Sequence, residues 1–136
     1  MEFNYNDGGR SKYFKGNVQD CVVRAIAIAN NMDYKEVYDY VNKKLKSYGC
    51  PSVRNKGVPK RIVKELLKEY GWTWVATMTI GSGCTTHLTK EELPSGTIIA
   101  SVSKHITCIK DGVINDTYDC SRDGARCVYG YWYKGV

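Results

Sequence analysis

The chain contains a thiol, an imidazole and a carboxylate in an order that suits nucleophilic catalysis. Cys21 begins an apolar run, residues 21–29, that is interrupted only by Arg24. This run predicts a helix, ending at about Asn30, that is buried on nearly every side. A thiol in the first turn of such a helix faces the positive end of the helix dipole, which favours the nucleophilic thiolate. Cys21 is therefore the candidate nucleophile.

His105 is the candidate base, and a hairpin predicts which carboxylate orients it. Asp111 and Gly112 are typical of a two-residue type I′ turn, since both central residues of that turn need positive φ. Such a turn would place His105 opposite Tyr118. Because side chains alternate along a strand, Asp116 then lies diagonally from His105 on the same face of the sheet. We therefore predict that Asp116 holds the imidazole.

The choice of Asp116 depends on the length of the hairpin loop. A three-residue loop would reverse which side chains share a face, and it would put Asn115, Thr117 or Asp119 near the histidine instead. The two-residue loop fits the residues better. The other three residues remain alternatives for the third member of the triad.

The order Cys, His, Asp, with the cysteine on a central helix and the histidine on a sheet, resembles that of papain-like cysteine peptidases. The pattern is similar to that of small bacterial and phage members, such as leader-cleaving peptidases of bacteriocin transporters and cell-wall endopeptidases with an Asp-Cys start. It most resembles a group of phage-type proteins with a Cys-Val-Val-Arg-Ala helix and an Asp-Gly-Val-Ile-x-Asp-Thr-Tyr-Asp hairpin. The resemblance covers residues 16–132.

This resemblance implies an α+β fold in which N-terminal helices, including the central helix with Cys21, pack on an antiparallel sheet. It implies a thiol hydrolase, either a peptidase or an isopeptidase, that acts on a protein or peptide with the triad Cys21, His105 and Asp116. The same triad also serves amidases, acyltransferases and transglutaminase-like enzymes. A phage or mobile-element origin, with action inside a bacterial cell, is a further implication.

Papain-like enzymes also use an amide side chain to stabilise the oxyanion, commonly a glutamine six residues before the cysteine. This chain has Lys15 at that position. Gln19 is our candidate donor, with Asn17 as the alternative, and the Cys21 backbone N–H would be the second donor. Asp20 opposes thiolate formation beside Cys21, unless its carboxylate caps the helix.

Length and composition indicate a single domain over residues 1–136, with a polar, flexible start at residues 1–16. The sequence has no apolar run long enough to span a membrane and no signal peptide, so we expect a cytoplasmic protein that does not bind membranes. Its six cysteines should then remain reduced. No cysteine pair has the spacing of a zinc knuckle, and the chain has two histidines, so we expect neither a metal nor a cofactor.

The remaining pattern predicts helices first and strands afterwards. Asp33 and Glu36 have the spacing of a capping box at the start of a second helix. Pro59 suits the first turn of a third helix, which Gly71 ends. Strands are expected at residues 72–80, 97–102, 105–109, 113–118 and 126–133, with tight links at 94–96 and 111–112 that indicate antiparallel pairing.

A second cysteine and histidine lie close together in the loop 81–87. Cys84 precedes His87 by three residues and is an alternative nucleophile. The loop lacks the lysine and the glycine spacing of a phosphate-binding loop. We interpret it as a flexible loop that borders the cleft.

Residues 43–68 are strongly basic, with nine lysines and arginines against one acidic residue, Glu65. This pattern is typical of a solvated helical face or of an electrostatic footprint for nucleic acid or an acidic protein. The alternative function is therefore a catalytically inactive binding module that uses this basic face. In that case six residues should form one positive face across two helices: Lys43, Lys44, Lys60, Arg61, Lys64 and Lys68.

Overall fold

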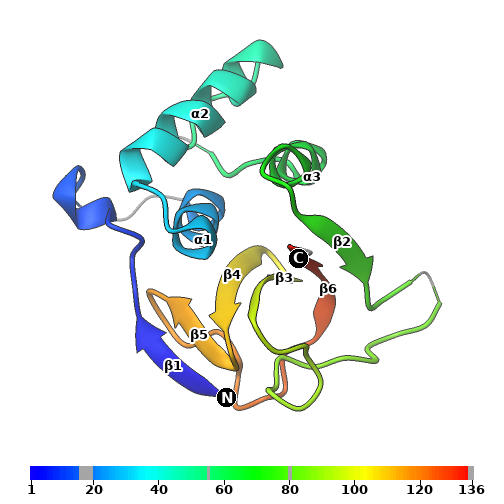
Figure 1. Ribbon diagram of the computed structural model, residues 1–136. Helices are drawn as coiled ribbons and strands as arrows, with labels where there is room; N and C mark the ends of the chain where they lie inside the picture. Colours follow the sequence, from blue (N-terminus) through cyan, green and yellow to red (C-terminus); the bar gives the residue numbers. More distant parts are fainter. Residues whose placement is uncertain (16–19, 55, 80, 135–136) are drawn as a thin grey trace.

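The computed structural model describes residues 1–15, 20–54, 56–79 and 81–134, which form an α+β structure with three α-helices on one side of a six-stranded sheet (Figure 1). The helices are α1 (Cys21–Asn30), α2 (Tyr34–Ser47) and α3 (Lys60–Glu69), preceded by a short 3-10 helix, η1 (Arg10–Lys12). The strands are β1 (Glu2–Tyr5), β2 (Thr73–Ala76), β3 (Thr97–Val102), β4 (His105–Lys110), β5 (Val113–Asp116) and β6 (Val128–Tyr133). None of the helices described is long and apolar enough to cross a bilayer.

The sheet is mixed, with the strand order β1-β5-β4-β3-β6-β2. β1 pairs with β5 in parallel, from Glu2 opposite Val113 to Tyr5 opposite Asp116. All the other neighbouring strands are antiparallel. The prediction of a wholly antiparallel sheet is therefore wrong at this edge, because a strand from the start of the chain, which the sequence pattern did not indicate, lies alongside β5.

The hairpin that carries the candidate carboxylate has the predicted two-residue turn. Asp111 and Gly112 have positive φ values of 48° and 79°, and Lys110 pairs with Val113 across the turn. The side-chain parity along β4 and β5 is therefore the predicted one. This parity places Asp116 on the same face as His105.

A second tight turn precedes His105. Val102 pairs with His105 at the end of the β3–β4 hairpin, and Lys104 in the turn has a φ of 56°. The tight link that we expected at residues 94–96 does not join paired strands, because β6 lies between β2 and β3 in the sheet. β2 and β3 are instead joined by a long connection, whose described residues are 77–79 and 81–96 (Figure 1).

Both faces of the sheet are apolar. On one face, α1 packs against β4, β3 and β5 and contacts α2 on its other side (Figure 1). The core on this side consists of apolar side chains from the three helices and includes Ile99 and Cys108 from the sheet. The opposite face is covered by the β2–β3 connection through Leu88 and Leu93. α1 is therefore covered on both sides, as its apolar composition predicted.

A disulfide joins Cys84 in the β2–β3 connection to Cys127, just before β6. The two segments lie alongside each other because the Leu88 N–H donates to the Arg126 carbonyl and the Val128 N–H donates to the Thr86 carbonyl. The expectation that every thiol stays reduced is wrong for this pair. Cys21, Cys50, Cys108 and Cys120 are free thiols.

Gly130 in β6 leaves room for the Trp74 ring of β2. A Cβ at this position would lie 2.3 Å from a carbon of that ring. We therefore expect Gly130→Ala to lower the free energy of unfolding by about 1–3 kcal/mol, measured by urea denaturation. Adding Trp74→Leu should lower the cost of the alanine in part, because the colliding ring is removed but the Val75 carbonyl oxygen, 2.7 Å from the same Cβ, remains. Equal costs in both backgrounds would contradict this packing.

Candidate active site

His105 and Asp116 form a short, buried pair at the end of the β4–β5 hairpin. The His105 Nε2 atom lies 2.6 Å from Asp116 Oδ2, and the two side chains are 8% and 3% exposed. The second carboxylate oxygen, Oδ1, accepts a hydrogen bond from the Thr117 N–H at 2.7 Å. Tyr118 lies beside the imidazole, with ring centroids 5.1 Å apart. The Nε2 atom of the imidazole is therefore hydrogen-bonded to the carboxylate of Asp116.

Cys21 and His105 line the same cavity, which has a volume of about 590 Å³. The cysteine comes from the first turn of α1, whose leading N–H groups have no partners within the helix. The histidine comes from the first residue of β4. Because Asp116 occupies Nε2, Nδ1 is the ring nitrogen free of that bond and suited to proton exchange with the thiol.

The surroundings of His105 favour its protonated form. Burial alone lowers the pKa of His105, but its hydrogen bonds with Asp116, Cys120 and Cys21 and the Asp116 charge outweigh burial and raise the pKa to about 12. Burial raises the pKa of Asp116, but the hydrogen bond and charge of His105 prevail and lower it. An imidazolium paired with a carboxylate is therefore the state at neutral pH.

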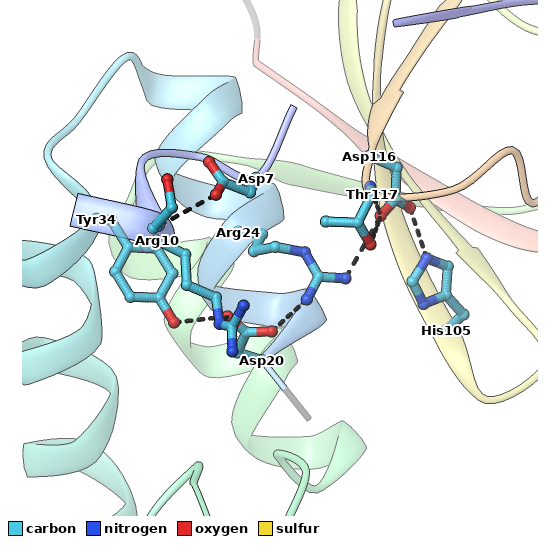
Figure 2. A network of polar contacts seen from close by, with 9 residues as sticks. Asp7, Arg10, Asp20, Arg24, Tyr34, His105, Asp116 and Thr117 are labelled. Carbon is cyan, nitrogen blue, oxygen red and sulfur yellow. Dashed lines mark hydrogen bonds and ion pairs between the residues drawn. The ribbon is translucent and has the colours of Figure 1, made fainter. Parts of the chain in front are cut away.

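A chain of charges continues from this pair into α1 (Figure 2). Arg24 donates to Asp116 Oδ1 at 3.4 Å through one guanidinium nitrogen and to Asp20 through the other. The Asp20 carboxylate, which is fully buried, also accepts the Tyr34 hydroxyl at 2.6 Å and lies 3.3 Å from the Arg10 guanidinium. Arg24 thus lies between the two buried carboxylates, and Arg10 lies beside that of Asp20.

Asp20 does not cap α1 through its side chain. Its carboxylate is occupied by Arg10, Arg24 and Tyr34 instead. The sequence suggested that the negative charge of Asp20 would oppose a thiolate at Cys21 unless Asp20 capped the helix. In the structure, the guanidinium groups of Arg10 and Arg24 balance that charge, and a helix cap does not.

Arg126 stabilises the turn before His105, and the sequence analysis did not single it out. Its side chain is buried, and it donates to the carbonyl of Ser103 in the turn before His105 and to the carbonyl of Cys120. Sequence reasoning also missed Arg10 and Tyr34. Arg24 carried a visible signal, because a charged residue inside an otherwise apolar helix must find buried partners.

The residues that we considered as alternatives to Asp116 and Cys21 have other partners. The Asn115 side chain accepts a hydrogen bond from Asn4, and the Asp119 carboxylate accepts one from Ser121. Asp116 is instead the residue that is hydrogen-bonded to the imidazole. Thr117 contacts Asp116 rather than His105. Cys84 is in the disulfide and has no thiol to react. The predicted oxyanion donor Gln19 and its alternative Asn17 lie outside the described residues.

Two groups of side chains within the described ranges have the spacing of metal ligands. The first contains Cys84, His87 and Cys127, whose two cysteines are joined to each other. The second contains His105, Asp116 and Cys120, in which the imidazole and carboxylate are already paired. Cys120 is buried and does not line the cavity, whereas Cys21 is partly exposed and does.

The basic residues of the 43–68 segment divide into two groups. Lys44 forms an ion pair with Glu69, and the Arg61 guanidinium lies over the Tyr48 ring, in the region where α2 meets α3. Lys60 and Lys64 extend toward the sheet, over the rings of residues 129 and 74. These four residues therefore meet different neighbours, two where α2 meets α3 and two beside the sheet, and a single positive face across the two helices stays a prediction.

Comparison of the chain with protein-family models, with curated proteins and with solved structures finds no significant match. The functional proposal below therefore rests on the residues and their geometry, together with the resemblance noted in the sequence.

The pairing of His105 with Asp116 predicts how the imidazole titrates. In a His87→Gln variant, His105 is the only histidine, and its NMR shifts should not titrate between about pH 5 and about pH 9. Adding Asp116→Asn should bring the midpoint into that range, because burial lowers the His105 pKa once the carboxylate charge is gone. A midpoint in that range with Asp116 intact would refute the pairing.

Arg24 should be essential for stability. Arg24→Met leaves two buried carboxylates short of a partner and should cost about 3–5 kcal/mol in urea unfolding. The matched control is Lys35→Met, which removes an exposed ion pair with Asp39 and should cost at most about 1 kcal/mol. Adding Asp20→Asn to Arg24→Met should reduce the cost. Similar losses for the two single variants would show that the buried network contributes little.

Proposed function

We propose that the protein is a thiol hydrolase of papain-like type that cleaves amide bonds in a protein or peptide, as a peptidase or an isopeptidase. One observation carries the proposal: Cys21, at the start of a buried helix, and His105, which is paired with Asp116, line the same open cavity. Thiol, imidazole and orienting carboxylate are the three parts that nucleophilic catalysis by cysteine requires.

In the first half of the reaction, the Cys21 thiolate attacks the substrate carbonyl carbon and forms a C–S bond, and the carbonyl oxygen becomes an oxyanion. The Cys21 backbone N–H donates to that oxyanion, with Gln19 as the proposed side-chain donor. Protonated His105 then gives its proton to the amide nitrogen, and the C–N bond breaks. The products are a free amine and a thioester on Cys21.

In the second half, neutral His105 takes a proton from water, and the hydroxide attacks the thioester carbonyl. The C–S bond breaks, the carboxylic acid leaves, and the thiolate–imidazolium pair is restored. Asp116 holds the ring throughout, so Nδ1 remains directed at the thiol. If an amine replaces water in this half, the same residues catalyse acyl transfer, and a simple amide substrate makes the protein an amidase.

The wall of the cavity indicates what lies beside the scissile bond. Five aliphatic side chains contribute to it: Val22, Val58, Val63, Val102 and Ile106. Cavities of this size commonly hold several apolar groups, with a few polar atoms that set orientation. A branched apolar residue next to the reacting carbonyl fits this lining.

The setting of the reaction is a prediction that rests on resemblance. A phage or mobile-element origin and action in the bacterial cytoplasm belong to the proposal. The Cys84–Cys127 disulfide is unusual for a reducing compartment. A catalytically inactive binding module is the competing proposal, and it requires that association with a partner be indifferent to alkylation of Cys21.

Selective alkylation tests the nucleophile. Cys21 and Cys50 are both partly exposed free thiols, so Cys50 is an internal control, whereas burial raises the pKa of Cys108 to about 12. Limiting iodoacetamide at about pH 6 should label Cys21 at least about tenfold faster than Cys50, because the imidazolium of His105 favours the thiolate. Tryptic mass spectrometry measures the ratio.

The site variants complete this test. His105→Ala should abolish the preference for Cys21, and Asp116→Asn should lessen it, since the imidazole then loses its orienting carboxylate. Equal labelling of Cys21 and Cys50 in the wild type, unaffected by His105→Ala, would mean that Cys21 is a structural residue.

A further inference from the structure

A second hollow continues from the cavity that contains Cys21. It has a volume of about 460 Å³ and lies among α3, β2 and the residues that follow β2. Lys60 and Tyr129 line both hollows. A chain bound at Cys21 can therefore extend over Lys60 and Tyr129 into the second hollow without leaving the surface.

The surface along this path is basic and aromatic. The Lys60 Nζ lies 4.9 Å from the centre of the Tyr129 ring, and the Lys64 Nζ lies 5.3 Å from the centre of the Trp74 ring. Lys104, which lines the first cavity, is the third ammonium group along the path. The rings hold the lysine stems against the sheet, and the charges remain exposed to solvent.

Acidic groups are nearly absent from this path. Among the described residues that line the two hollows, Asp20 is the one carboxylate, and it is fully buried against Arg10 and Arg24. Neither Lys60 nor Lys64 forms an ion pair with a carboxylate in the part of the chain that the structure describes. In contrast, Lys44 is neutralised by Glu69. The positive charge next to the active site is thus available to a ligand.

We propose that this surface, defined by Lys60, Lys64, Trp74 and Tyr129, binds an acidic stretch of the polypeptide substrate on one side of the scissile bond. The inference rests on the proposed hydrolase function. It commits to an acidic polypeptide because the path is continuous with an aliphatic cavity at the nucleophile, which suits a peptide side chain. A nucleic acid would gain little from that cavity, since phosphate contacts dominate its affinity.

Three fluorescein-labelled probes test the proposal by fluorescence anisotropy with the full chain. The first is a ten-residue peptide with a valine at its centre and four glutamates on one side, the second has glutamines in place of the glutamates, and the third is a twelve-nucleotide thymidine oligonucleotide. The glutamate peptide should bind more tightly than the other two. It should also slow the alkylation of Cys21, because it covers the cavity.

Charge-reversal variants locate the binding surface. Lys60→Glu with Lys64→Glu should weaken binding of the glutamate peptide about tenfold or more, since two attractive pairs become repulsive. The matched control is Lys46→Glu, which lies on α2 outside both hollows and should leave binding nearly unchanged. Thermal denaturation should show that the double variant and the control variant are both folded.

Several results would overturn the inference. These are equal binding of the glutamate and glutamine peptides, tighter binding of the oligonucleotide, and equal loss of binding in the Lys46→Glu control. Binding that protects Cys21 would support the surface even if His105→Ala left the alkylation pattern unchanged. An alkylation pattern that His105→Ala leaves unchanged would refute the hydrolase proposal but not the binding surface. The failure of one proposal can therefore be distinguished from the failure of the other.

Discussion

One run of buried ion pairs ties the N-terminal segment, α1 and the β4–β5 hairpin together, through Arg10, Asp20, Arg24, Asp116 and His105. Taking a carboxylate out of water costs several kcal/mol, and that cost is offset only where a cation and good hydrogen bonds meet it inside the protein. Because the partners come from three separate segments, the network is complete only when all three are docked. The geometry of the candidate active site is therefore a consequence of the packing of the whole domain.

The network is also balanced in charge. Two arginines face two aspartates when the reactive pair is neutral, and transfer of a proton from Cys21 to His105 adds one charge of each sign. The buried region thus has no net charge in either state. With this balance, an aspartate directly before the thiol is compatible with the chemistry that we propose, since Asp20 is neutralised by Arg10 and Arg24.

Much of the site could be predicted because its parts are local. The apolar run after Cys21 defines α1 to its last residue, and the Asp33 side chain accepts the Glu36 N–H as the capping box predicted. The turn at residues 111–112 determines side-chain parity by itself, so Asp116 meets His105 as expected. Helix dipoles, caps and two-residue turns depend on neighbours within a few positions in the chain, and such information is present in the sequence.

The sequence by itself thus determined the helices, the main strands, the hairpin register and the pairing of His105 with Asp116. Only the tertiary structure decided which buried charges meet. The ion pair of Arg24 with Asp116, the hydrogen bond of Arg126 to Ser103, the parallel pairing of β1 and the Cys84–Cys127 disulfide all join segments far apart in the chain. Such contacts form only when packing removes both segments from water together, and no local pattern of residue types specifies which partner will be present.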